Sequence, residues 1–256
     1  MVLTIDVGNT NTVMGIFGDK ETLLFDTRIE TNASRMADEY VFILMNALAL
    51  HKIEAEAVKG AIVSSVVPPA SEQIRNAVKK LFGIEAMLVG PGVKTGLNIR
   101  IDDPATLGAD LCCAGVAVKE YYPLPCIIID LGTATKVLAV NEKGDFLGGA
   151  IAVGVKMALD ALSANTAALP LISTGRVEKA IGTNTVDCMR SGAILGMACM
   201  LDGFIERFES EIGPAASIVA TGGLSGLITP CCKHDIILDP ELLLKGLMVI
   251  YNRNRK

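Results

Sequence analysis

The chain has 256 residues, of which 51% are hydrophobic and 20% are charged, and its formal net charge is −5 at pH 7. This length suits one large domain or two smaller ones, and the acidic balance, without a basic stripe, argues against a nucleic-acid partner. No apolar run reaches about 18 residues, and the N-terminus lacks the positively charged start of a signal peptide, so we expect no membrane span and a cytoplasmic protein.

The seven cysteines predict neither a disulfide framework nor a zinc site. Their number is odd, no two of them form a C-x-x-C pair, and only two histidines accompany them, which does not match the usual zinc-ligand spacing. Most of them lie in apolar runs, so we expect small buried side chains in a reducing compartment. The cysteines are Cys112, Cys113, Cys126, Cys188, Cys199, Cys231 and Cys232.

The early part of the chain alternates between strand-like and helix-like segments. Three apolar runs with strand character come first, and two later stretches carry apolar residues at helical spacing. A run rich in β-branched residues lies between the two helices and ends at Pro68-Pro69. Such alternation favours an α/β fold. The expected elements are strands at 2–7, 12–17 and 22–30, a helix at 36–50, a strand at 59–67, a helix at 71–82 and a strand at 85–90.

The later part of the chain continues in the same way. It begins with a helix, passes through a strand pair and a hairpin, and ends in a helix. The expected elements are a helix at 107–122, a strand pair across 126–140, a hairpin with its turn at 142–145, helices at 156–163 and 185–208, a strand from 217 that ends in Thr221-Gly222-Gly223, a short strand at 235–239 and a helix at 240–252.

The opening motif occurs twice. "LTIDVGNTNTVMGIF" aligns with "IIIDLGTATKVLAV": a strand, an aspartate, an apolar residue, a glycine, small polar residues and a second strand. The two aspartates, Asp6 and Asp130, lie nearly half the chain apart. Internal repetition predicts a repeated structure, so we expect two copies of one α/β unit, residues 1–115 and 116–256, that face each other across a cleft.

Each repeated turn has two possible roles. An aspartate at a strand end, followed by glycine and hydroxyl residues, can form a nest of backbone N–H groups that binds anionic oxygens, while the carboxylate holds a cation that screens a phosphate. The alternative is an ordinary hairpin turn, which the same residue types favour. The repetition, together with Thr221-Gly222-Gly223 after a third strand, favours phosphate binding.

Other nucleotide-binding motifs are absent from the sequence. "GPGVKTG" lacks the Gly-Lys pair of a P-loop, and Thr95 occupies the third glycine position of G-x-G-x-x-G. No H-R-D or D-F-G set of a protein kinase occurs.

Seven motifs in order resemble one known family. "DVGNTNTVMGIF", "GADL", "DLGTAT", "GGAIAVG", "NTAALP", "GTNTVDCMRSG" and "ATGG" follow the order found in the type III pantothenate kinases. The resemblance spans almost the whole chain. It implies duplicated ribonuclease-H-like domains of the actin and sugar-kinase type on either side of a nucleotide cleft. It also implies ATP-dependent phosphorylation of pantothenate, the first step of coenzyme A biosynthesis, by a cytoplasmic homodimer that needs Mg²⁺ and a monovalent cation, K⁺ or NH₄⁺.

The resemblance assigns roles to individual residues. The first phosphate loop would bind the nucleotide, a carboxylate in the G-A-D segment would be the catalytic base, and a second aspartate would hold the monovalent cation. The residues that correspond are Asp6, Val7, Gly8, Asn9, Thr10, Asn11, Thr12, Val13 and Thr133 for ATP, Gly108, Ala109, Asp110, Leu111 and Thr185 for pantothenate, Asp110 as base, and Asp130 as cation ligand.

Asp110 also has a simpler interpretation. It falls in the first turn of the helix expected at 107–122, where an acidic residue interacts favourably with the positive end of the helix dipole. The small neighbours Gly108 and Ala109 would leave room for a ligand.

The chain departs from the family pattern at five positions, mostly on the substrate side. Leu111 replaces the usual arginine, Lys136 and Leu138 replace a threonine and an aspartate, Val153 replaces a proline, and Ile101 replaces an aromatic residue. Two hypotheses therefore remain: an active pantothenate kinase, or a catalytically weakened relative that binds nucleotide or pantothenate and acts as a binding or regulatory protein.

Overall fold

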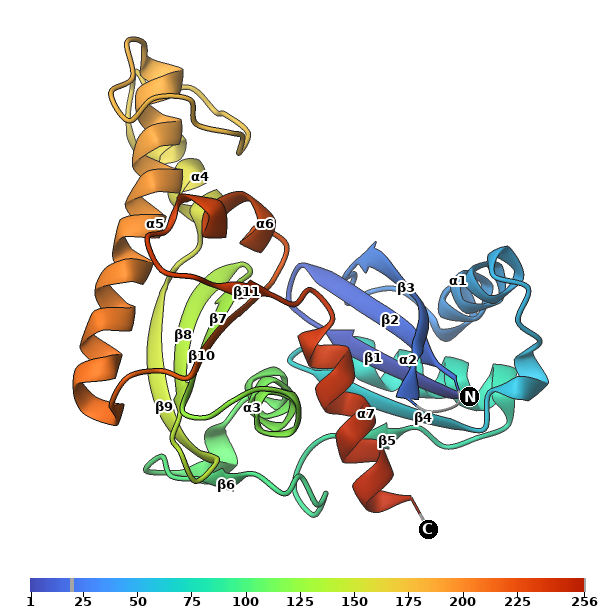
Figure 1. Cartoon of the computed structure of the whole chain (residues 1–256). Coiled ribbons are helices and arrows are strands. Elements are labelled where there is room, and N and C mark those ends of the chain that lie inside the picture. The colour runs from blue at the N-terminus through green and yellow to red at the C-terminus, as the bar shows by residue number, and fades with distance from the viewer. Residues whose placement is uncertain (19–20, 256) are drawn as a thin grey trace. The chain divides into compact units, whose positions relative to one another are not determined.

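The computed structural model describes residues 1–18 and 21–255, which form two compact units (Figure 1). Unit 1 comprises residues 1–96, 103–120 and the C-terminal segment from Leu242 onward, and unit 2 comprises residues 97–102 and 121–241. Each unit contains one mixed β-sheet with helices packed on it.

Unit 1 is built on a five-stranded sheet with the order β3-β2-β1-β4-β5. The first three strands are antiparallel neighbours, whereas β4 and β5 run parallel to β1. The strands are β1 Val2–Val7, β2 Asn11–Phe17, β3 Leu23–Glu30, β4 Gly60–Ser65 and β5 Met87–Leu88, and the helices are α1 Ala37–Leu50, α2 Pro68–Phe82, α3 Ala109–Tyr121 and α7 Leu242–Asn254.

Side-chain alternation on β1 gives the first sheet two different faces. Leu3, Ile5 and Val7 point into a buried apolar core that includes residues of α1 and α2. Thr4 and Asp6 point to the opposite face. Gly15, the register partner of Thr4, lies on that face, and a Cβ added to it would lie 2.8 Å from Leu244 of α7. The helix and the sheet therefore approach closely at Gly15, which has no side chain.

The helix expected at 71–82 begins earlier, at Pro68, and its first two residues are the proline pair that we expected to end the preceding strand. Proline suits the first turn of a helix because its missing N–H would have no partner there and its φ is already close to helical. Strand β4 already ends at Ser65, so the two prolines begin the helix and do not end the strand.

Unit 2 repeats the plan of unit 1 in a six-stranded sheet with the order β11-β10-β7-β8-β9-β6. Strands β9, β8 and β7 are antiparallel neighbours, and β10 and β11 continue in parallel, as in the first sheet. The expected duplicated α/β fold is thereby confirmed. The strands are β6 Asn98–Ile99, β7 Cys126–Leu131, β8 Ala134–Val140, β9 Asp145–Val153, β10 Ser217–Thr221 and β11 Ile237–Leu238, and the helices are α4 Val155–Asn165, α5 Thr185–Ile212 and α6 Ser225–Ile228.

Strand β6, which the sequence does not predict, pairs with β9 in parallel, and one buried carboxylate adds side-chain contacts to that pairing. Asp145 at the start of β9 accepts a hydrogen bond of 2.8 Å from Asn98 and pairs with Arg100 at 2.7 Å. The bond from Asn98 is the largest influence on the carboxyl, and the pKa of Asp145 is lowered. A two-residue strand has too short a pattern to be recognised in a sequence, and side-chain contacts hold it in place.

The two units do not follow the expected ranges 1–115 and 116–256. That boundary falls inside α3, and the last helix of the chain, α7, packs against β1, β2 and β4 of unit 1. Gly246 of α7 lies against the backbone of Cys113 in α3. The second face of the first sheet is therefore covered by α7, a helix that follows the whole of unit 2 in the sequence.

Helix α5 is long and apolar enough to span a membrane by length and composition, although only 39% of its most apolar window is buried. One such helix is weak evidence for a membrane span, because core helices pass the same test. Several of its residues, including Met189, Ile194, Leu201 and Ile205, belong to the core of unit 2.

The expectation that most cysteines are buried is only partly met. Cys112, Cys113 and Cys126 are buried, whereas Cys188, Cys199 and Cys231 are exposed and Cys232 is intermediate. Cys188 and Cys199 lie on α5, which turns one side towards the core. Within the residues that the structure describes, no group of three or more His, Cys, Asp or Glu side chains could hold a metal ion.

Candidate functional site

Asp6 lies at the carboxyl end of β1, between two other strands. Its register partner on antiparallel β2 is Val13, and its partner on parallel β4 is Ser64. Because directly paired residues project to the same face of a sheet, Asp6 and Ser64 stand side by side on the face that α7 covers. Ser64 was not predicted from the sequence, where its signal is a small polar residue at the end of an apolar strand.

Asp110, the expected base, lies in the first turn of α3. Cys113, one turn further along the helix, is buried, and burial raises the pKa of its thiol well above the ordinary value, with the charges of Cys112, Asp6 and Asp110 raising it further. Helix α7 links the two elements, because it packs on β1 and its Gly246 lies against the backbone of Cys113 in α3.

Gly108 makes room for the carboxylate of Asp110. A Cβ built on Gly108 would lie 2.5 Å from Oδ1 of Asp110, a distance at which one of the two atoms has to move. The absence of a side chain at Gly108 thus leaves room for the present orientation of the Asp110 carboxylate.

The loop after Asp6 is closed by its own backbone and by one threonine. The N–H of Gly8 donates to the Asn11 carbonyl at 3.0 Å, and the Thr31 hydroxyl donates to the Gly8 carbonyl at 2.8 Å. Asn9, Thr10 and Asn11 are exposed at its tip. This loop can therefore offer amide and hydroxyl groups to an anion, although the N–H of Gly8 is engaged within the turn.

The three remaining residues of the expected first phosphate loop are less exposed than its tip. Val7 and Thr12 are buried, and the Thr12 hydroxyl lies 2.8 Å from that of Thr31. Val13 is half-buried on the same face as Asp6. Contacts from Val7 or Thr12 to a nucleotide would have to use backbone atoms.

Asp130 holds the position in unit 2 that Asp6 holds in unit 1. It lies near the end of β7 with Lys136 as its partner on antiparallel β8 and Thr221 as its partner on parallel β10. Thr221 therefore corresponds to Ser64, and Lys136 corresponds to Val13. The duplicated sheets place the two aspartates alike and differ in the neighbour across the hairpin.

The turn that contains Thr133 lies against two glycines of unit 2. A Cβ on Gly154 would collide with the Thr133 carbonyl oxygen, and one on Gly222 would lie 2.6 Å from the backbone of Leu131. Gly222 also has a φ of 94°, which a side chain would disfavour. Glycines from β9–α4 and β10–α6 thus form a backbone cradle around this turn, with the Thr133 side chain exposed.

Asp130, the expected ligand of a monovalent cation, already has a cationic side chain beside it. The ammonium nitrogen of Lys136 lies 2.9 Å from Oδ2 of Asp130. A second cation at that oxygen would meet a positive charge that is already in contact.

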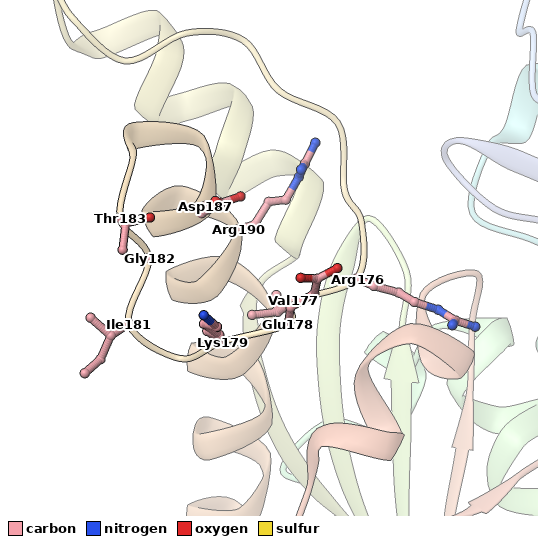
Figure 2. A pocket seen from close by; sticks show the side chains of 9 residues that line it. All are labelled: Arg176, Val177, Glu178, Lys179, Ile181, Gly182, Thr183, Asp187 and Arg190. Carbon is pink, nitrogen blue, oxygen red and sulfur yellow. The ribbon is translucent and has the colours of Figure 1, made fainter.

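Thr185, the expected substrate contact across subunits, is exposed at the start of α5. A pocket of about 320 Å³ lies beside it, with Thr183 and Asp187 among its lining residues (Figure 2). Cationic and anionic side chains both contribute to the lining, which consists of Arg176, Val177, Glu178, Lys179, Ile181, Gly182, Thr183, Asp187 and Arg190.

Two sheets of matching strand order, each with an aspartate at the same strand position, define the fold class of duplicated, actin- and sugar-kinase-like α/β domains. Solved structures agree on the fold. A polyphosphate/ATP-glucomannokinase from Arthrobacter sp. strain KM has a TM-score of 0.50 at 15% identity, covering 98% of this chain and 97% of that one. An activator of 2-hydroxyisocaproyl-CoA dehydratase from Clostridium difficile, with bound ADPNP, has a TM-score of 0.54 at 13% identity, covering 98% and 93%.

Residues 2–207 match the sequence profile of the type III pantothenate kinases. Proteins of that description from Moorella thermoacetica and Halalkalibacterium halodurans are 43% and 39% identical to this chain, each over 99% of this chain and 100% of the relative. The chain belongs to the type III pantothenate kinase family.

Proposed function

We propose that this chain transfers the terminal phosphoryl group of ATP to the primary hydroxyl of pantothenate, giving 4′-phosphopantothenate, in the first step of coenzyme A biosynthesis. The observation that carries the proposal is the contact of α7 with both β1, which bears Asp6, and α3, which bears Asp110, within unit 1. This arrangement supports a site that combines the end of the first phosphate loop with the candidate base. Membership of the family supports the choice of substrate.

Asp110 is the proposed catalytic base, with Gly108, Ala109 and Leu111 as the neighbouring substrate segment. Transfer to an alcohol requires the hydroxyl to be aimed at the γ-phosphorus, and a carboxylate can orient it and accept its proton late in the transfer. In the first turn of α3 the side chain lies at the positive end of the helix dipole. Its proposed part is chiefly to hold the hydroxyl in place.

Asp6 and the loop from Val7 to Val13 are the proposed nucleotide-binding residues of unit 1. The exposed groups of Asn9, Thr10 and Asn11 would donate to phosphate oxygens. Asp6 supplies a hard oxygen ligand of the kind that Mg²⁺ prefers. Mg²⁺, when bound, neutralises charge on the phosphates during transfer. Thr133, exposed in its glycine-lined turn, is the proposed ATP contact of unit 2.

We further propose that the protein acts in the cytoplasm as a homodimer in which Thr185 contacts pantothenate bound to the other subunit. The exposure of Thr185 and its place beside a pocket support this role. Leu171 and Ile181, 73% and 83% exposed in the segment before α5, are apolar side chains that a second copy would cover.

A coupled assay of ADP release tests the proposed function. Purified protein with Mg-ATP should release ADP when pantothenate is added, and not when a polyol acid of similar size is added. The product should carry one phosphate at the primary hydroxyl by ³¹P NMR. Tight pantothenate binding without ADP release would instead favour the alternative of a binding protein.

A further inference from the structure

The ion pair of Asp130 and Lys136 is largely enclosed. Their side chains are 15% and 20% exposed, whereas the surface pair of Asp38 and Lys80 leaves 63% and 61% exposed. Exposed pairs contribute little because water screens them. An enclosed carboxylate needs a positive partner, because burial without one is costly.

The sheet register keeps the two residues side by side. Asp130 and Lys136 are direct partners on antiparallel β7 and β8, separated by a short turn, so their side chains leave the same face of the sheet. Thr221 continues the row on β10, and it is 2% exposed. The strand pairing thus keeps the lysine beside the aspartate, so its ammonium stays within reach of the carboxylate.

Unit 1 provides an internal comparison. There the residue in the position of Lys136 is Val13, which cannot supply a charge to Asp6. The two repeated aspartates therefore differ in one respect: only the one in unit 2 has a cation built into the neighbouring strand.

We propose that the Lys136 ammonium is a built-in monovalent cation and that this enzyme works without added K⁺ or NH₄⁺. A lysine ammonium is a compact single positive charge with three N–H donors, so it can satisfy the Asp130 oxygen that a free monovalent ion would otherwise bind. The expected effect on kinase activity rests on the proposed function, whereas the expected effect on stability does not.

The test compares melting temperatures and kinase rates in KCl and in tetramethylammonium chloride at equal ionic strength. Tetramethylammonium is much larger than K⁺ and has no N–H donor, so it cannot replace K⁺ in direct contact with a carboxylate. For the wild type we expect the same melting temperature in both salts and rates within about twofold. Lys136→Thr removes the ammonium and leaves a hydroxyl oxygen, so KCl should raise its melting temperature by about 2–4 °C and its rate by about tenfold over the organic salt.

Two further variants separate the proposal from a purely structural ion pair. Lys136→Arg keeps the charge and should remain independent of K⁺. Lys143→Thr makes the same charge change as Lys136→Thr at an exposed turn of the same unit and should also show no difference between the salts. A wild type that is stabilised by KCl, or a Lys136→Thr protein that is destabilised equally in both salts, would overturn the proposal. A wild type without kinase activity would refute the proposed function, while its melting temperatures would still decide the cation question.

Discussion

Thr12 of β2 and Thr135 of β8 hold the same position in the two sheets, but their hydroxyl groups differ in hydrogen bonding. Each follows the repeated turn and pairs with the residue after the aspartate, Val7 or Leu131. Thr12 is hydrogen-bonded to Thr31, whereas the buried Thr135 hydroxyl has no hydrogen-bond partner among the described residues. By register, Gly154 stands where Thr31 stands in unit 1, so the side chain that could accept the bond is missing.

This difference predicts opposite results for the same substitution. Thr12→Val should lower the melting temperature by about 2–6 °C, because a buried hydrogen bond worth about 1 kcal/mol or somewhat more is lost. Thr135→Val should leave it unchanged or raise it, because no bond is broken and a buried polar group is removed. Calorimetry on both variants measures this. A larger loss for Thr135→Val than for Thr12→Val would contradict the assignment.

Asp110 should be needed for turnover rather than for stability. Asp110→Asn is expected to lower kcat by about 10²–10⁴-fold with little change in ATP affinity, because an amide cannot accept the hydroxyl proton. Steady-state kinetics and a melting curve on the same preparation measure both quantities. A variant that melts earlier but turns over at a normal rate would make Asp110 a helix-capping acid only.

Gly108→Ala should reproduce part of this effect without touching the carboxyl group. The new methyl group would displace the Asp110 carboxylate, which lies 2.5 Å from its position, so we expect kcat to fall by about tenfold or more. Gly203→Ala is the matched control, since a Cβ at that position on α5 meets nothing within 4 Å. Equal kinetics for the two alanine variants would show that Gly108 does not position Asp110.

Asp6 should control the use of Mg-ATP. Asp6→Asn is expected to weaken kcat/KM for Mg-ATP by about a hundredfold, close to 3 kcal/mol, because a charge-assisted contact is lost. Asp26→Asn makes the same change at an exposed position on β3 of the same sheet and should behave like the wild type. Normal Mg-ATP kinetics in Asp6→Asn would remove Asp6 from the site.

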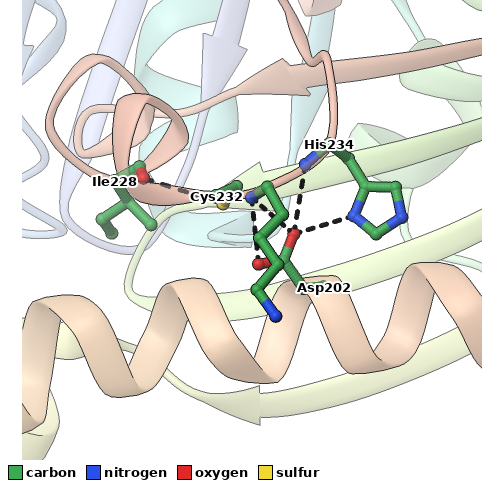
Figure 3. A network of polar contacts seen from close by, with 5 residues as sticks. Asp202, Ile228, Cys232 and His234 are labelled. Carbon is green, nitrogen blue, oxygen red and sulfur yellow. Dashed lines mark hydrogen bonds and ion pairs between the residues drawn. The ribbon is translucent and has the colours of Figure 1, made fainter.

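Acid should destabilise unit 2 through Asp202. This carboxylate on α5 accepts hydrogen bonds from the backbone of Lys233 at 3.0 Å and lies 2.8 Å from the His234 ring (Figure 3). Burial opposes its ionisation, but the bonds from His234 and from the two backbone N–H groups outweigh it, and the pKa of Asp202 is lowered.

A lowered pKa in the folded state means that the unfolded chain takes up the proton first as the pH falls. The stabilisation by Asp202 is therefore complete above the ordinary aspartate pKa of about 4 and is lost as the pH falls through the lower folded value. Asp202→Asn should melt earlier than the wild type at pH 7, and the difference should shrink below about pH 4. Asp160→Asn, exposed on α4, is the control. A difference that grows on acidification would reverse the assigned sign.

The sequence by itself determined the repeated strand–turn–strand units, because turn residues and side-chain alternation are local and can be read without knowing what packs on them. For the same reason Asp6, Asp130 and Asp110 could be singled out, each at the end of a strand or in the first turn of a helix. Only the tertiary structure decided that α7 returns to cover the first sheet, that Cys199 and Cys231 are exposed, and that Lys136 contacts Asp130. Those outcomes depend on strand register and on which surfaces meet, and contacts between residues distant in the sequence fix both.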